Sequence, residues 1–288
     1  MIANEWSLDA GKPWRITIAY QTYEQAAVAR QYQSSATFNA RAALHQRFST
    51  DPGWHAWVFA QFDLPAECRI LEVGCGPGRL WQENRARIPA GWRLTLTDMS
   101  ASMLAGVRER VGDLTQLECI AQVDVQTIPY EDAAFDAVIA NHMLYHVPEF
   151  ATAMREINRV LKADGTLYAT ACGSDHMREF WEVLTPFVVD MRERMDQQEC
   201  LERFSLENAP SRLAPWFADM QVRRHRNALV VTEVEPLVAY AQSIATGGEP
   251  VLCDERLTEY RTLVAERIRR EGAYHITNNS GIAIARKG

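Results

Sequence analysis

The chain has 288 residues, of which 47% are hydrophobic and 23% charged, the composition of an ordinary globular protein with a core of its own. Its 30 Lys and Arg against 37 Asp and Glu give a net charge of −7, so we expect no nucleic-acid partner. No apolar run reaches the length of a membrane span, and the first residues lack a signal-peptide pattern, which predicts a cytoplasmic protein without membrane insertion. The six cysteines contain no Cys-x-x-Cys pair, so we expect neither a metal site nor a disulfide framework.

The first part of the chain is helical in character. Residues 22–62 are rich in Ala, Gln and Arg, and Pro52-Gly53 interrupts them once. Residues 15–20 alternate like a short strand, but the sequence assigns no role to residues 1–22. We expect residues 1–62 to form a helical lid.

Residues 63–173 differ, because short β-like runs alternate there with helical stretches. The stretch 148–161 places Phe150 and Met154 on one face and ends before Gly165, as a helix would. Strands separated by helical crossovers favour a mostly parallel sheet. The expected strands cover residues 69–73, 93–98, 117–123, 135–141 and 166–171.

After residue 173 the pattern changes to longer helices and two late strands. Residues 221–231 and 275–286 alternate as strands. A long connection would let them complete the same sheet in antiparallel orientation. We therefore expect an α/β fold with a doubly wound, mostly parallel seven-stranded sheet, an N-terminal helical lid and a late helical insertion within residues 174–288. The helices expected in this part cover residues 177–195, 206–217, 233–243 and 254–270.

The most informative segment is the strand-to-helix junction after Glu72. The run Gly74-Cys75-Gly76-Pro77-Gly78 has glycine at alternate positions, which allows a sharp turn and lets a ligand approach the backbone. A dinucleotide site has the spacing Gly-x-Gly-x-x-Gly, but here the third glycine comes one residue early and Arg79 takes its place. The charge of Glu72 would also repel a diphosphate, whereas it suits a cationic ligand such as an amino group or a sulfonium.

The segment Glu72-x-Gly74-x-Gly76-x-Gly78 resembles motif I of the class I S-adenosylmethionine-dependent methyltransferases. The resemblance implies a Rossmann-like methyltransferase fold with S-adenosyl-L-methionine as cofactor. Asp98, at the end of the next strand, would then take both ribose hydroxyls, and Met99 would pack on the adenine face. Asp124 and Val125 would contact the adenine amino group. The cofactor-binding residues that the resemblance implies are Glu72, Gly74, Cys75, Gly76, Asp98, Met99, Asp124, Val125, Asn141 and Arg41.

The string Asn141–Pro148, at the end of the fourth strand, resembles a motif of small-molecule methyltransferases. These are the ubiquinone/menaquinone methyltransferases and methyltransferase types 11 and 25. Residues 159–165 resemble the same group's approach to the fifth strand. The likeness covers about residues 30–173 and implies methyl transfer to a small-molecule acceptor. The string also lacks the Asn-Pro-Pro-Tyr signature of enzymes that methylate amino groups of nucleic acids.

His146 is the candidate general base, because it lies just past the C-terminal end of a strand, where open α/β sheets place their ligands. A histidine at a similar position is catalytic in the phosphoethanolamine methyltransferases, paired with a tyrosine from an N-terminal helix. That resemblance implies Tyr32 as the partner of His146. The alternative is that His146 caps or packs against the following helix. Arg41, in the lid, is expected to reach the methionine carboxylate of the cofactor.

His142, Tyr145, Trp54 and Trp57 are the candidate acceptor-binding residues. The tryptophans would form an aromatic wall suited to apolar or cationic acceptors, or else would simply fill the core. The sequence leaves open the acceptor atom, the metabolite and the oligomeric state, a homodimer included. Two other functions also stay open: a nicotinamide- or flavin-dependent oxidoreductase, and a protein that binds S-adenosylmethionine without transferring its methyl group.

Overall fold

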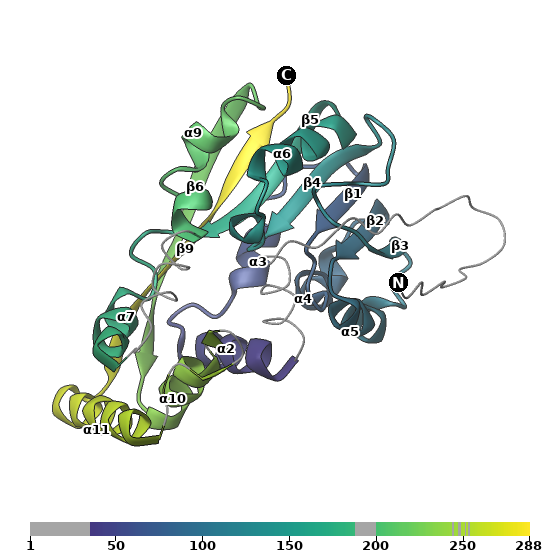
Figure 1. Ribbon diagram of the computed structural model, residues 1–288. Helices are drawn as coiled ribbons and strands as arrows, with labels where there is room; N and C mark the ends of the chain where they lie inside the picture. Colours follow the sequence, from purple (N-terminus) through teal and green to yellow (C-terminus); the bar gives the residue numbers. More distant parts are fainter. Residues whose placement is uncertain (1–34, 188–199, 244, 247–248, 251, 253) are drawn as a thin grey trace, which may run out of the picture.

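The computed structural model describes residues 35–187, 200–243, 245–246, 249–250, 252 and 254–288. Its centre is a seven-stranded sheet with the order β3-β2-β1-β4-β5-β9-β6 (Figure 1). Strands β1 to β5 run parallel, and β9 is antiparallel to both β5 and β6, which confirms the expected mostly parallel α/β sheet. The strands are β1 (Glu67–Val73), β2 (Gly91–Asp98), β3 (Leu117–Gln122), β4 (Phe135–Asn141), β5 (Leu161–Cys172), β6 (Asp219–Val231) and β9 (Tyr274–Arg286).

The strand order reverses between β1 and β4, at the centre of the sheet. The chain winds from β1 towards β3 on one side and from β4 towards β6 on the other. Residues 70–73 of β1 and 137–140 of β4 are all buried, as expected of central strands that are covered on both faces. In such sheets ligands bind at the carboxyl ends of the strands, next to the point of reversal. The glycine run after β1 and the Asn141–Pro148 string after β4 both begin there.

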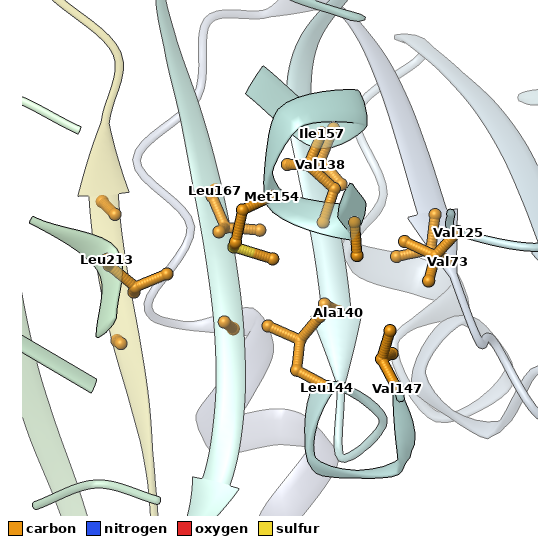
Figure 2. Packing of buried hydrophobic residues seen from close by; sticks show 14 of the residues in the cluster. Val73, Val125, Val138, Ala140, Leu144, Val147, Met154, Ile157, Leu167 and Leu213 are labelled. Atoms are coloured by element: carbon orange, nitrogen blue, oxygen red, sulfur yellow. The ribbon is translucent and has the colours of Figure 1, made fainter. Parts of the chain in front are cut away.

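Helices cover both faces of the sheet. On one face, Met154 and Ile157 of α6 (Phe150–Val160) pack with Val138 and Leu167 (Figure 2). Burying side chains of this size contributes about 1.5–3 kcal/mol each to stability. The short helix α9 (Ala209–Leu213) adds to the same core cluster. On the other face lie α3 (Trp54–Phe59), α4 (Arg79–Glu83) and α5 (Ala101–Val111).

The last two strands extend past the rest of the sheet and carry a helical cap. β9 pairs with β6 along its whole length but with β5 only through residues 280–286, so residues 274–279 form a two-stranded ribbon with β6. A third core cluster covers this ribbon, with Leu229 and Tyr274 contributed by the strands and Leu44 and Tyr260 by helices. The cap helices, grouped together in Figure 1, are α2 (Ser35–Phe48), α7 (Arg178–Leu184), α10 (Val234–Ser243) and α11 (Asp254–Glu271). The short strands β7 (Ala245–Thr246) and β8 (Glu249–Pro250) pair beside them.

Some helix boundaries differ from the sequence-based expectations. The helix expected over 206–217 is only α9, which begins with Pro210 in its first turn and ends before Pro215. The helix expected over 177–195 gives way after α7 to a 3-10 turn, Thr185–Phe187, at a proline that cannot donate a helical hydrogen bond. Among the described helices, none is long and apolar enough to cross a membrane.

Candidate functional site

The glycine run forms a tight loop between β1 and α4. Gly74, Gly76 and Gly78 all have positive φ, at 66°, 54° and 80°, a region that other residues rarely adopt. A Cβ at Gly74 would lie 2.8 Å from two atoms of the Met143 side chain, so glycine is needed there for packing. A Cβ at Gly76 would meet no atom within 4 Å. Gly76 therefore presents open backbone at the end of β1, where a ligand can approach the main chain.

Asp98 lies at the end of β2 and joins that strand to the glycine loop. Its Oδ2 accepts a hydrogen bond from the backbone N of Gly76 at 2.9 Å, and its Oδ1 accepts one from the backbone N of Ser100 at 2.8 Å. Burial raises the pKa of Asp98, and these two hydrogen bonds oppose the rise. Each carboxylate oxygen keeps acceptor capacity, so Asp98 can still bind a vicinal diol.

The residues that follow β2 and β3 offer an apolar surface beside Asp98. Met99 is 37% exposed and, in the described part of the chain, is one of two large hydrophobic side chains on the surface. Val125 is buried. The carboxylate of Asp124 accepts hydrogen bonds from the backbone N of Gln126 at 2.8 Å and from its side-chain amide at 3.1 Å. A planar group can therefore lie against Met99, next to a carboxylate that its own loop orients.

Glu72 is enclosed beneath the glycine loop, at 1% exposure. Its Oε2 accepts a hydrogen bond from the indole N–H of Trp81 at 2.6 Å. Burial raises the pKa of Glu72 to about 8, against the hydrogen bond from Trp81 and with a further contribution from Asp98. The carboxyl group is therefore protonated at neutral pH in the ligand-free protein, and a bound cation would favour its ionisation.

This pKa predicts how stability depends on pH. Between about 4.5 and 8 the native Glu72 holds a proton that the unfolded chain releases, so the free energy of unfolding should fall as pH rises through this range. One such group contributes a slope of up to about 1.4 kcal/mol per pH unit. Glu72→Gln should flatten the profile and raise the free energy of unfolding above pH 7. Urea unfolding of both proteins at several pH values measures this, and parallel profiles would contradict it.

Cys75 lies within the glycine loop and is buried. Its backbone N donates to the carbonyl of Thr97 at 2.9 Å, which fixes the loop against β2. Burial raises the pKa of the Cys75 thiol well above its usual value, and the neighbouring carboxyl groups of Glu72 and Asp98 add to this. The side chain is therefore a neutral thiol, without the thiolate that nucleophilic chemistry needs.

The end of β4 is held by hydrogen bonds to β5. The hydroxyl of Thr170 donates to the side-chain carbonyl of Asn141 at 2.6 Å and accepts from the backbone N of His142 at 2.8 Å. His142 has φ 52°, an uncommon conformation for a non-glycine residue, and this bond helps to hold it. The chain then forms a 3-10 turn, Leu144–His146.

The structure brings the four predicted acceptor residues together. The rings of Trp54 and His142 lie 5.0 Å apart, and Trp57 stacks on Trp54 at 5.5 Å. Tyr145 meets His142 edge-on at 6.2 Å and His146 at 4.5 Å. These side chains come from α3 and from the turn after β4, so they form one aromatic wall at the strand ends.

Three further aromatic residues lie beyond this wall, and the sequence did not indicate that they would meet. His45 of α2 stacks on His176 with ring centroids 5.8 Å apart and meets Tyr240 of α10 at 6.1 Å. Burial lowers the pKa of His45 to about 4 and that of His142 to about 3, and it lowers the pKa of His176 as well. All three imidazoles are therefore neutral at pH 7. Among the described residues, no three His, Cys, Asp or Glu side chains are grouped so that they could hold a metal ion.

His146 is half-buried and lies near two arginines. Burial lowers the pKa of His146 to about 4, and the charges of Arg41 and Arg203 contribute to this. The guanidinium of Arg41 donates to the hydroxyl and the carbonyl of Ser243, at 3.0 and 2.8 Å, and so joins α2 to α10. His146 therefore holds a lone pair at neutral pH and can accept a proton. Tyr32, its expected partner, lies outside the described residues.

Comparison with known proteins gives a consistent result. Residues 71–169 match the family model described as a methyltransferase domain. The chain is 31% identical over 163 residues to a malonyl-[acyl-carrier protein] O-methyltransferase of Enterobacter lignolyticus, covering 54% of this chain and 58% of the relative. It is 37% identical over 118 residues to a ubiquinone biosynthesis O-methyltransferase of Xanthomonas oryzae, covering 39% of this chain and 46% of the relative. The chain thus spans about half the length of these curated relatives.

A solved structure shares the fold across most of the chain. It is phosphoethanolamine N-methyltransferase 2 of Haemonchus contortus in complex with S-adenosyl-L-methionine, at a TM-score of 0.57 and 14% identity. The match covers 93% of this chain and 61% of that protein. At this identity the likeness shows a common architecture, and the chemistry has to be argued from the residues of this chain.

Proposed function

We propose that the chain transfers the methyl group of S-adenosylmethionine to an oxygen atom of a small-molecule acceptor, in keeping with the match of residues 71–169 to the methyltransferase-domain model. The observation that carries the proposal is the open backbone of Gly76 beside the carboxylate of Asp98, to which it is hydrogen-bonded. The two relatives named above are both O-methyltransferases by name, which supports oxygen as the acceptor atom. The aromatic wall after β4 lies at the same strand ends and supports an acceptor that binds there.

Each part of the cofactor has a matching group in the site. Asp98 binds the two ribose hydroxyls, Met99 packs on the adenine, and Asp124 with Val125 faces the adenine amino group. Glu72 lies under the loop on the side of the cationic sulfonium and amino groups, where its carboxyl can ionise when they bind. Gly74, Cys75 and Asn141 shape the loop and strand ends between them.

The reaction is an in-line displacement. A lone pair of the acceptor oxygen forms a bond to the methyl carbon, and the carbon–sulfur bond breaks with its electron pair left on sulfur. Alignment of the two reactants is the main contribution of the enzyme and supplies on the order of 7–11 kcal/mol. The leaving thioether needs no proton, so the only proton to be moved is that of the acceptor. We propose that His146 accepts it, with Tyr32 as partner.

Asp98→Ala should lower the affinity for S-adenosylmethionine by ~10–100-fold, because charge-assisted hydrogen bonds to two hydroxyls contribute about 1.5–3 kcal/mol. Calorimetric titration measures this change. Asp136→Ala is the matched control, since Asp136 also accepts a backbone hydrogen bond, from Arg69 at 2.8 Å, but at the opposite end of the strands. Unchanged affinity in Asp98→Ala would remove the ribose assignment.

The same titration separates the two alternative functions. Binding of NADH in preference to S-adenosylmethionine would identify an oxidoreductase instead. Binding of S-adenosylmethionine with no S-adenosylhomocysteine formed across a panel of phenols, carboxylic acids and amines would favour a protein that only binds the cofactor.

A further inference from the structure

Thr170 lies on β5 at the point where the neighbouring strand β4 ends. The two strands pair in parallel with Asn141 opposite Thr170, and the side chain of Thr170 is buried. Its hydroxyl donates to the side-chain carbonyl of Asn141 at 2.6 Å and accepts from the backbone N of His142 at 2.8 Å. The hydroxyl thus uses its single proton and one lone pair on two consecutive residues. A valine of the same shape could make neither bond.

The bond to His142 holds an uncommon backbone conformation. His142 has φ 52°, which costs free energy in a residue with a Cβ and persists only where the surroundings hold it. Because β4 ends here, the backbone N of His142 donates to the side chain of Thr170 instead of to the backbone of β5. The imidazole makes a weaker contact, since its Nδ1 lies 4.0 Å from the sulfur of Cys172. Of these two contacts with β5, the bond to Thr170 therefore holds the turn more strongly.

The turn after β4 connects the two halves of the site. Met143 packs against the glycine loop, because a Cβ at Gly74 would lie 2.8 Å from both the Cβ and the Cγ of Met143. The imidazole of His142 lies 5.0 Å from the ring of Trp54 in the aromatic wall. The carbonyl of Met143 also accepts the backbone N of His146 at 3.0 Å. A change of the backbone at His142 would therefore alter the contacts with the loop and the wall together, and would move His146 as well.

We propose that Thr170 is a positioning residue, whose hydroxyl fixes residues 141–143 so that the glycine loop and the aromatic wall keep the spacing that methyl transfer requires. This inference rests on the proposed function, because it assigns a role in the same reaction. Thr170 acts through Asn141, His142 and Met143 and needs no contact with either reactant. In-line displacement depends on close alignment of the reactants, so a shift of this turn should weaken cofactor binding and methyl transfer alike.

Thr170→Val tests the proposal, because valine keeps the shape of the side chain and removes the hydroxyl. The backbone N–H of His142 and the side-chain carbonyl of Asn141 then each lose a partner. We expect the affinity for S-adenosylhomocysteine, measured by calorimetric titration, to fall by about 5- to 30-fold. Hydrogen exchange of the His142 amide should become about 10-fold faster or more. Thr170→Ser keeps the hydroxyl and should return both values most of the way to those of the wild type.

Two further variants separate positioning from a general effect on stability. Thr95→Val is the matched control, because Thr95 is also a buried threonine of this sheet but lies in the middle of its strand, β2. It should leave both the cofactor affinity and the exchange of the His142 amide unchanged. Met143→Ala shortens the side chain that packs on Gly74 and leaves the hydroxyl of Thr170 in place. It should weaken cofactor binding while the His142 amide stays protected.

Three outcomes would overturn the inference: unchanged cofactor affinity in Thr170→Val, no recovery in Thr170→Ser, or an equal loss of affinity in Thr95→Val. If Thr170→Val does not fold, Thr170→Cys provides the same test, since a thiol is a weak donor and a weak acceptor. Failure of the proposed function is a separate result. In that case S-adenosylhomocysteine would not bind the wild type, and the exchange rate of the His142 amide would still show whether Thr170 holds the turn.

Discussion

Replacing Gly76 by Val should abolish detectable binding of S-adenosylmethionine, lowering the affinity by more than about 100-fold, and leave the chain folded. Gly76 has φ 54°, and a Cβ placed on it meets no protein atom within 4 Å, so a side chain there would occupy only the space through which a ligand approaches the loop. The positive φ costs a residue with a Cβ about 1–2 kcal/mol, a loss that a domain of this size can tolerate. Calorimetric titration with S-adenosylmethionine measures the effect.

Gly272 offers a matched control for the strain. It has φ 81°, a Cβ on it also meets nothing within 4 Å, and it lies between α11 and β9, away from the glycine loop. Gly272→Val should therefore lower the melting temperature by a similar amount and leave cofactor affinity unchanged. Gly76→Ala adds a smaller test, since a methyl group fills less of the same space. Equal cofactor affinity in Gly76→Val and Gly272→Val would show that the loop is not the cofactor site.

The residues proposed for the cofactor are predictable from the sequence because each follows directly from a strand. Gly76 follows β1, Asp98 ends β2, and Asp124 follows β3. Parallel strands bring their carboxyl ends to one edge of a sheet, so the order of the motifs along the chain also determines their proximity. The hydrogen bond between Gly76 and Asp98 connects two segments that a sequence pattern can identify separately.

The aromatic residues beyond the wall are less predictable because they depend on long-range packing. His45, His176 and Tyr240 meet only because the ribbon of β6 and β9 extends past β5 and carries α2, α7 and α10. No local spacing connects these three positions. Arg41 was expected at the methionine carboxylate of the cofactor, and its contact with Ser243 could not be inferred without the position of α10. The assignment of Arg41 to the methionine carboxylate stays a prediction.

Long-range packing also determines which side chains of the alternating strand, residues 221–231, are buried. Its basic residues include His225, whose imidazole is buried, lies 2.9 Å from the carboxylate of Asp51 and contacts the rings of Trp54 and Trp57. Alternation predicted the strand, but only the ring contacts of His225 with Trp54 and Trp57 show which face of β6 meets α3. The aromatic wall is thus held from both sides, by the turn after β4 and by β6.

His146→Gln should lower turnover by ~10²–10⁴-fold with a phenolic acceptor that still carries its proton, and should leave cofactor affinity unchanged. Glutamine can accept a hydrogen bond from the hydroxyl but cannot take up its proton. The pKa of His146 is lowered to about 4 from 6.5, so the ring is unprotonated, and active as a base, throughout the neutral range. The kcat/KM profile should therefore stay level through pH 6.5 and decline only towards pH 4, and this decline should be absent in the variant.

An aryl carboxylate offers a control acceptor for the same variant, because it is ionised at neutral pH and has no proton to give up. With it, His146→Gln should lose less than about tenfold in turnover, the difference between the two acceptors being the contribution of the base. If Tyr32 shares the role, Tyr32→Phe should cost about as much as His146→Gln with the phenol, and the double variant little more than either. A variant within threefold of the wild type on the phenol, or a decline centred near pH 6.5, would show that His146 does not act as this base. Alignment of the acceptor with the methyl group would then carry the transfer, with His146 only packing against the turn after β4.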